Sequence, residues 1–247
     1  MTAPALQVAG LSKRFGGVAA TRDVSLTVMP GERRLLIGPN GAGKTTLFNL
    51  ICGDLVADTG SIQVFGRELR GKPIRARTAA GLGRTYQVLT LFPGETLLHN
   101  VALAAIGGGR TGWVPWGSFA GRADIRTRAR AALAQVGLEQ QGESVASETS
   151  YGERRRLELA MVLAQSPRLL LLDEPLAGLS ATERVTVRAV LEALPRTVSI
   201  VLIEHDMDVA LALADRITLL NFGSVVLEGT RTEVVADPRT REVYLSG

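Results

Sequence analysis

The stretch that decides the fold is Arg34-Leu35-Leu36-Ile37-Gly38-Pro39-Asn40-Gly41-Ala42-Gly43-Lys44-Thr45. Its apolar start predicts a buried strand, and the residues from about Lys44 to Ile51, before Gly53, predict a helix. The glycine-rich run between them fits the phosphate-loop pattern in the strand–loop–helix context that confirms it. We therefore expect nucleotide phosphates to bind here.

Each part of this loop has a chemical role in phosphate binding. The glycines let backbone N–H groups close around the phosphates, and the following helix adds its dipole. Lys44 is expected to reach the β- and γ-phosphates, and Thr45 to offer its hydroxyl to Mg²⁺. The residues expected to bind nucleotide are Gly38, Pro39, Asn40, Gly41, Ala42, Gly43, Lys44, Thr45 and Thr46.

Strand and helix signals alternate on both sides of a helical middle. Short alternating runs near the N-terminus predict a sheet lobe. After residue 165, apolar runs at 169–172, 199–203 and 217–220 alternate with helical patterns at 182–194 and 207–214, which favours a parallel sheet wrapped by helices. From about 88 to 165 strand signals fade, and Gly107–Gly121 is interpreted as a loop insertion. We expect an α/β core (1–87 and 166–247) interrupted by a helical subdomain (88–165).

Composition excludes several classes of protein. The chain has 247 residues, of which 46% are hydrophobic and 21% charged, and no apolar run approaches 18 residues. We expect a soluble protein without a membrane span or secretory signal. Its single cysteine, Cys52, fits a reducing cytoplasm. The net charge of +4 raises a nucleic-acid interpretation, but aromatic residues make up only 4% and the arginines are scattered. We favour solvated helix faces and expect no nucleic-acid partner.

Adjacent carboxylates follow the leucine run at 169–172. Asp173 and Glu174 are compatible with a simple turn cap, but beside a phosphate loop they favour catalysis. Asp173 is expected to hold Mg²⁺ directly or through water, and Glu174 to act as general base on the attacking water.

Three further residues are candidates for the site. A lone histidine is more often structural, but His205 follows the predicted strand 199–203 beside the site, and we favour contact of its imidazole with a γ-phosphate. Gln87 is either an ordinary polar residue or a ligand of Mg²⁺ or of the lytic water, since an amide both donates and accepts. Phe15 is compatible with the core and with stacking on an aromatic base, and spacing alone does not separate these readings.

Taken together, these motifs resemble the nucleotide-binding subunits of ABC transporters, over nearly the whole chain. The resemblance makes Gly38–Thr45 Walker A, Leu169–Asp173 Walker B, Gln87 the Q-loop glutamine, His205 the switch histidine and Phe15 the A-loop aromatic residue. The signature, usually Leu-Ser-Gly-Gly-Gln, falls on Thr149-Ser150-Tyr151-Gly152-Glu153. It keeps Ser150 and Gly152, which the family uses to contact the opposite subunit's γ-phosphate. Ser180 stands where the family commonly has Asp in the D-loop.

One branch of the family matches in more detail. The tyrosine-containing signature, Arg84-Thr85-Tyr86-Gln87 and Glu204-His205-Asp206-Met207 resemble the ATP-binding proteins of branched-chain amino acid uptake, the Liv type. The Gly107–Gly121 insertion favours the G-type subunit over its F-type partner. Urea and short-chain amide importers share much of this pattern and remain an alternative.

The resemblance also implies cofactors and partners. ATP and Mg²⁺ are expected, with two ATPase subunits sandwiching two ATP molecules as a homodimer or as a heterodimer with an F-type subunit. Two separate transmembrane permease subunits are implied, docked around Val88–Thr96, with a solute-binding protein acting indirectly. The subunit is then expected at the cytoplasmic face of the inner membrane. The rival readings are an ABC ATPase acting on nucleic acid or the ribosome, which usually has tandem domains or coiled coils, and a small-molecule P-loop kinase, which leaves the signature turn and His205 unexplained.

Overall fold

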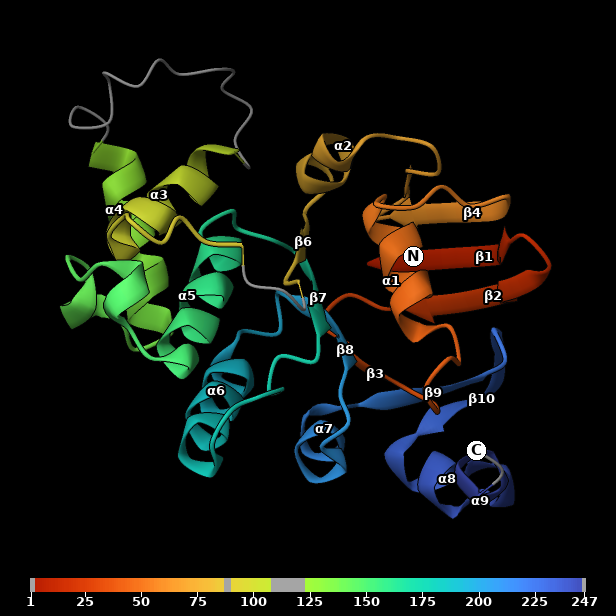
Figure 1. Cartoon of the computed structure of the whole chain (residues 1–247). Helices are drawn as coiled ribbons and strands as arrows, with labels where there is room; N and C mark the ends of the chain where they lie inside the picture. The colour runs from red at the N-terminus through yellow and green to blue at the C-terminus, as the bar shows by residue number, and fades with distance from the viewer. Residues whose placement is uncertain (1–2, 87–89, 108–122, 246–247) are drawn as a thin grey trace. The chain divides into compact units, whose positions relative to one another are not determined.

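The computed structural model describes residues 3–86, 90–107 and 123–245. They form two compact units (Figure 1). Unit 1 comprises Met1–Arg84, Arg168–Glu174 and Pro195–Gly247, and unit 2 comprises Thr85–Pro167 and Pro175–Leu194. Within the described residues, no helix is long and apolar enough to cross a membrane.

Unit 1 begins with an antiparallel sheet of order β2-β1-β4-β5. Its strands are β1 (Leu6–Phe15), β2 (Val18–Val28), β4 (Thr59–Val64) and β5 (Arg67–Glu68). Along the second half of β2, buried and exposed residues alternate, with Val24, Leu26 and Val28 buried. This period-2 pattern is why one face joins the core and the other meets solvent. The predicted N-terminal sheet lobe is confirmed.

The second sheet of unit 1 has the order β10-β9-β3-β8-β7-β6. Its strands are β3 (Arg33–Ile37), β6 (Leu82–Arg84), β7 (Leu169–Asp173), β8 (Ser199–Ile203), β9 (Arg216–Asn221) and β10 (Ser224–Thr230). All pairs are parallel except the edge pair β10–β9. Every residue of β3, β7 and β8 is buried, as expected for parallel strands covered on both faces. The predicted α/β fold class is confirmed.

Helix α1 (Lys44–Cys52) joins the two sheets of unit 1 into one core (Figure 1). Leu47, Phe48, Leu50 and Ile51 are fully buried in a cluster that also contains side chains of β1, β4 and β7. Helix α1 ends at Gly53, whose φ of 85° is the left-handed conformation that favours glycine. The other helices of unit 1 are α2 (Ile74–Ala79), α7 (Met207–Leu213), α8 (Arg231–Ala236) and α9 (Pro238–Leu245).

Unit 2 is helical in its described residues. It contains α3 (Leu97–Gly107), α4 (Ala123–Gln135), α5 (Tyr151–Leu163) and α6 (Ala181–Ala193), with short 3₁₀ turns at Glu139–Gln141 and Ala146–Glu148. Helix α6 belongs to this unit, whereas the sequence analysis places its residues in the core. Within unit 2, Glu183 of α6 accepts a hydrogen bond from the Gly152 N–H of α5, a contact between segments 31 positions apart. Nearly all of the expected insertion Gly107–Gly121 lies outside the described residues.

Candidate functional site

The phosphate loop connects β3 to α1, and its backbone is fixed by close contact with neighbouring chain. Gly38 has φ 148°, and a Cβ there would lie 2.2 Å from the Leu220 carbonyl oxygen of β9. Gly43 has φ 99°, and a Cβ there would lie 2.4 Å from the Ala20 carbonyl oxygen. Only glycine fits both the conformation and the space at these two positions. The loop is therefore held in shape by β2 and β9.

Lys44 opens α1 and lies against the loop. Its side-chain Nζ donates hydrogen bonds to the carbonyl oxygens of Gly38 (2.6 Å) and Pro39 (3.0 Å), and the residue is buried. Burial lowers the pKa of Lys44, while the nearby carboxylates of Glu174 and Asp173 act in the opposite direction. The ammonium thus lies between the loop backbone and two acidic groups, where it can balance the charge of bound phosphates.

Asp173 is the last residue of β7 and is only 2% exposed. Burial raises the pKa of its carboxyl group, and the Arg84 guanidinium, with Nη2 3.6 Å from Oδ2, partly offsets that effect. Arg84 itself donates hydrogen bonds to Asp54 (2.6 Å) and Asn49 (2.7 Å). A fixed cation from β6 therefore lies beside the carboxylate predicted to hold Mg²⁺.

Glu174 and His205 are brought together in space. His205 Nε2 lies 2.9 Å from Glu174 Oε1, and the Glu174 N–H donates to the Ile203 carbonyl oxygen (2.9 Å). Glu174 has φ 48°, a left-handed conformation that is uncommon outside glycine. The His205 N–H donates to Glu204 Oε2 (2.8 Å). The ends of β7 and β8 thus hold an acid and an imidazole in hydrogen-bond contact, an arrangement suited to proton transfer.

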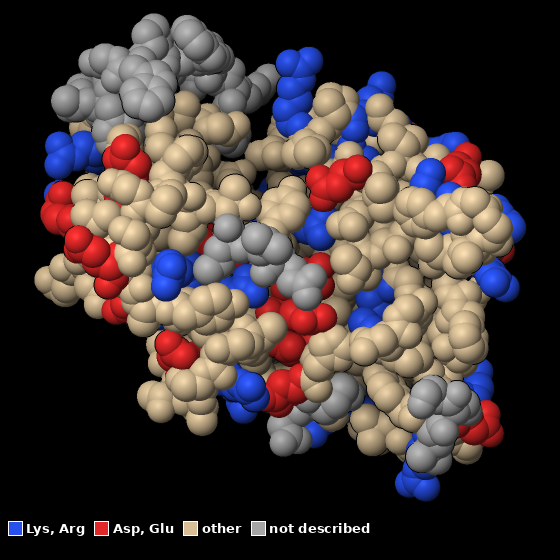
Figure 2. Space-filling model, viewed as in Figure 1, with Lys and Arg blue, Asp and Glu red and all other residues tan. Residues whose placement is uncertain are grey.

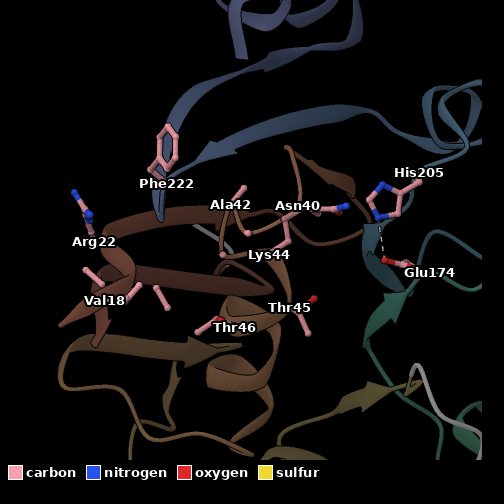
Figure 3. A pocket seen from close by; sticks show the side chains of 14 residues that line it. Val18, Arg22, Asn40, Ala42, Lys44, Thr45, Thr46, Glu174, His205 and Phe222 are labelled. Carbon is pink, nitrogen blue, oxygen red and sulfur yellow. Dashed lines mark hydrogen bonds and ion pairs between the residues drawn. The ribbon is translucent and has the colours of Figure 1, made fainter. Parts of the chain in front are cut away.

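These groups surround a pocket of about 320 Å³ (Figure 3), within the size range of small-molecule sites. Figure 3 shows Glu174 and His205 at one end, Val18, Arg22 and Phe222 at the other, and Lys44 and Thr45 between them. The described lining residues are Val18, Ala19, Ala20, Arg22, Asn40, Gly41, Ala42, Gly43, Lys44, Thr45, Thr46, Glu174, His205 and Phe222. Phe15 lies outside this lining, at the end of β1, about half exposed.

Oxygen ligands suitable for Mg²⁺ come from two elements of the same unit. Thr45 Oγ1 at the start of α1 and the Asp173 carboxylate at the end of β7 are hard donors, the type that Mg²⁺ prefers. Such sites usually combine one or two protein ligands with phosphate oxygens and water. Within the described part of the chain, no cluster of three or more His, Cys, Asp or Glu side chains forms a metal site by itself. The residues present fit an ion that arrives with phosphates.

Comparison with known proteins identifies the family. The ABC transporter family matches residues 21–177. The chain belongs to the ABC transporter ATP-binding family. It is 35% identical to the branched-chain amino acid transport ATP-binding protein BraF of Pseudomonas aeruginosa and 37% identical to LivG of Salmonella typhimurium, in each case over 99% of both chains. The ADP conformation of MJ1267, an ATP-binding cassette, superposes with a TM-score of 0.87 at 27% identity over both entire chains.

In this ABC ATPase the segment predicted to be the signature, Thr149–Glu153, lies in unit 2. Ser150 is the N-cap of α5: its Oγ accepts from the Glu153 N–H (3.2 Å), and its own N–H donates to Glu153 Oε2 (2.7 Å). The Gly152 N–H donates to Glu183 Oε1 (3.1 Å), and a Cβ on Gly152 would lie 2.2 Å from that oxygen. The signature is therefore a capped helix start at which two backbone N–H groups meet carboxylates.

Gln87 lies outside the described residues, but the ABC ATPase holds the residue before it firmly. The Tyr86 N–H donates to Glu158 Oε1 (2.9 Å), and the Tyr86 carbonyl oxygen accepts from Arg155 Nη1 (3.1 Å). Arg155 and Glu158 form a buried ion pair on α5 (3.1 Å). Burial raises the pKa of Glu158, and the hydrogen bond from Tyr86 opposes this shift. The chain entering the Q-loop is thus tied to the signature helix.

Three residues of this architecture were not predicted from the sequence. Arg84 contacts Asp173 across 89 positions of the chain, so no local pattern reveals it. Glu183 was likewise not identified, although Ser180 and Glu183, three residues apart, have the recognisable spacing of a capping box. Phe222 lines the pocket, and its sequence signal was the unusual Phe-Gly pair in a short hairpin turn.

Proposed function

We propose that this ABC ATPase binds and hydrolyses MgATP to drive separate permease subunits that import branched-chain amino acids. The observation that carries the catalytic part is the 2.9 Å contact between Glu174 and His205 at the end of a pocket floored by the phosphate loop. The substrate follows from full-length similarity to BraF and LivG, whose names specify branched-chain amino acid transport.

The side chains divide the work of hydrolysis. The phosphate loop and Lys44 hold the phosphates, and Thr45 and Asp173 supply protein ligands for Mg²⁺. Glu174 accepts a proton from the attacking water, and His205, bonded to that carboxylate, senses the γ-phosphate. Gln87 completes the set as a ligand of the metal or the water. The bound Mg²⁺ supplies charge neutralisation for the phosphoryl group.

The signature segment acts on a second nucleotide. Ser150 is the N-cap of α5 and Gly152 lies in its first turn, and a helix N-terminus favours an anion. We propose that they face the γ-phosphate bound by a second ATPase subunit, either a copy of this chain or an F-type partner. The pair then docks on two transmembrane permeases at the cytoplasmic face of the inner membrane, with a solute-binding protein supplying the amino acid.

Hydrolysis is tested with two variants in the purified protein. Glu174→Gln keeps size and a hydrogen-bond acceptor for His205 but loses the base, so turnover falls by about 10²- to 10⁴-fold while an ATP-bound dimer accumulates. Lys44→Ala instead weakens ATP binding itself. Near-normal hydrolysis by Glu174→Gln would remove Glu174 as the base, and unchanged ATP affinity in Lys44→Ala would contradict the phosphate-loop assignment.

The substrate is tested by uptake in cells lacking this chain. Leucine uptake is expected to fall and to return with the wild-type chain but not with Glu174→Gln, while urea uptake stays unchanged. Loss of urea or amide uptake instead would assign the transporter to that related class. Nucleic-acid binding is not expected, because Lys and Arg side chains on the visible face of each unit lie dispersed among other residues (Figure 2). Tight, salt-sensitive binding to DNA or RNA would contradict the proposal.

A further inference from the structure

Arg84 lies on the face of the parallel sheet that α1 covers. Strand β6 pairs with β7 in parallel, and Arg84 stands opposite Leu171 (Figure 1). Side chains two positions apart in a strand share a face, so Asp173 points to the same side as Leu171 and Arg84. Leu171 belongs to the core cluster that also contains Leu47 and Ile51 of α1. The Arg84 side chain is thereby directed toward both α1 and the Asp173 carboxylate.

The Arg84 guanidinium is anchored at the C-terminal end of α1. Its Nη1 donates to Asp54 Oδ2 (2.6 Å), and its Nη2 donates to Asn49 Oδ1 (2.7 Å). Asn49 lies in the last turn of α1, and Asp54 follows Gly53, the C-cap of that helix. A planar guanidinium that is bonded through two of its nitrogens has a fixed orientation, unlike the ammonium of lysine. The far end of the phosphate-loop helix therefore sets the direction in which this cation points.

The same guanidinium faces the carboxylate that is expected to hold Mg²⁺. Its Nη2 lies 3.6 Å from Asp173 Oδ2, and the two side chains are only 8% and 2% exposed. Asp54 is the nearer partner and balances the positive charge of Arg84. Lys44 and Glu174 contribute one further charge of each sign. The Asp173 carboxylate thus remains the surplus negative charge, and buried charges in proteins are paired or coordinate metals.

A purely structural role is the simpler alternative, and Arg77 shows what that role looks like. Arg77 is buried on α2 and donates to the Ile51 carbonyl oxygen (2.7 Å) and to the Lys72 carbonyl oxygen. It holds the same end of α1, yet neither acceptor belongs to the site. Arg84 differs because it also faces a predicted metal ligand. One arginine thus anchors the helix alone, and the other anchors the helix and reaches the site.

We propose that Arg84 is a positioning residue for Asp173, which orients this carboxylate for the metal ion that arrives with the nucleotide. Thr45, the other expected metal ligand, lies in the first turn of α1 beside Lys44. Arg84 fixes the Asp173 carboxylate against the opposite end of the same helix, so one rigid element sets both ligands. Partners that orient a metal-binding carboxylate typically change metal affinity by about 10- to 100-fold. This role rests on the proposed function, because it requires Asp173 to bind Mg²⁺.

The test measures how strongly Mg²⁺ improves nucleotide binding to the purified chain. An ATP analogue with an imido bridge between its β- and γ-phosphates, which resists hydrolysis, is titrated calorimetrically in EDTA and again in Mg²⁺. The dissociation constant in EDTA divided by that in Mg²⁺ is the Mg²⁺ ratio. In Arg84→Met this ratio is expected to fall by about 10- to 100-fold. The dissociation constant in EDTA is expected to stay at the wild-type value, because the phosphate loop and Lys44 are unchanged.

A double-mutant cycle shows whether Arg84 acts through Asp173. Asp173→Asn alone is expected to lower the Mg²⁺ ratio, and adding Arg84→Met to it should lower the ratio no further. Additive losses in the double variant would show that the two residues act independently and would overturn the positioning role. Arg84→Lys keeps the charge but loses the two-pronged anchor, so it should recover little of the ratio. Full recovery would show that a positive charge suffices, which also contradicts positioning.

Arg77→Met is the matched control, because it removes the other guanidinium at the end of α1. It is expected to lower the urea unfolding midpoint and to leave the Mg²⁺ ratio at the wild-type value. A fall equal to that of Arg84→Met would reduce Arg84 to a structural anchor. A wild-type ratio in folded Arg84→Met would overturn the positioning role alone, and Arg84→Lys serves in the same cycle where the methionine variant does not fold. A wild-type ratio in Asp173→Asn would remove Asp173 as a metal ligand, and that part of the proposed function fails with it.

Discussion

Arg34 should be the most stabilising charged residue of the strand that leads into the phosphate loop. Its side chain is 1% exposed and makes four polar contacts. Nε donates to Glu32 Oε1 (2.6 Å), Nη1 to Thr218 Oγ1 (2.9 Å) and Nη2 to the Thr27 carbonyl oxygen (2.8 Å). Nη1 also lies 2.8 Å from Glu228 Oε1. The perturbation is Arg34→Met, which keeps an unbranched chain in the same space.

The cost follows from what the substitution leaves behind. The Glu32 side chain is only 9% exposed, so its carboxylate loses its cation in a buried setting. Removing one partner of a buried ion pair costs about 3–5 kcal/mol. Glu228 contributes little to that cost, because it is 30% exposed and Arg216 Nη2 lies 3.7 Å from it. We expect Arg34→Met to lower the free energy of unfolding by about 3–5 kcal/mol.

The assay is urea unfolding followed by circular dichroism, with the midpoint compared at unchanged slope. The control is Arg188→Met, which removes an exposed pair with Glu192 and should cost at most about 0.5 kcal/mol. Adding Glu32→Gln to Arg34→Met removes the orphaned charge and keeps an acceptor for the Met29 N–H, so part of the loss returns. A loss no greater than that of Arg188→Met, or no recovery in the double variant, would refute the reasoning.

Two further predictions concern a helix cap and the thiol. Ser180→Ala removes the N-cap of α6, where Ser180 Oγ accepts from the Glu183 N–H, and should cost about 0.5–2 kcal/mol in urea unfolding; Ser180→Asn should retain most of that stability, and equal losses would contradict the capping role. Burial raises the pKa of Cys52 from 9.0 to about 12, so at about pH 8 the folded chain holds roughly a thousandfold less thiolate than the unfolded chain. Iodoacetamide labelling read by mass spectrometry should therefore be slow until urea unfolds the protein, and rapid labelling of the folded chain would contradict the buried thiol.

Elements that carry their own pattern could be predicted from the sequence. The apolar run at 199–203 coincides with β8, and that at 169–172 with β7 apart from Asp173, because strands buried on both faces are apolar at nearly every position. The phosphate loop could also be located, because its glycines and Lys44 lie in one continuous motif of the sequence. Strand β6 could not, because three residues, Leu82-Gly83-Arg84, show no periodicity.

Contacts between segments far apart in the sequence could not be predicted. Arg84 meets Asp173, and Glu183 meets Gly152, across 89 and 31 positions of the chain. The sequence around Arg84 or Glu183 gives no indication of which distant residue each contacts. The position of Phe222 could not be predicted either. The hydrogen bond from the Gly223 N–H to the Ala42 carbonyl oxygen, which places this turn beside the phosphate loop, joins segments far apart in the sequence. The motifs indicate the candidate groups, and contacts between distant segments, through side chains and backbone, position them.

Backbone strain points to the same pocket. The described non-glycine residues with positive φ are Asp23, Phe65, Ser166, Glu174 and Phe222. Two of these five, Glu174 and Phe222, line the pocket, at opposite ends of it (Figure 3). The Glu174 N–H donates to the Ile203 carbonyl oxygen. Beside Phe222, the N–H of the next residue, Gly223, donates to the Ala42 carbonyl oxygen. Such conformations persist only where the surroundings impose them. The backbone at both ends of the pocket, at Glu174 and beside Phe222, is therefore held by hydrogen bonds to neighbouring segments of the core.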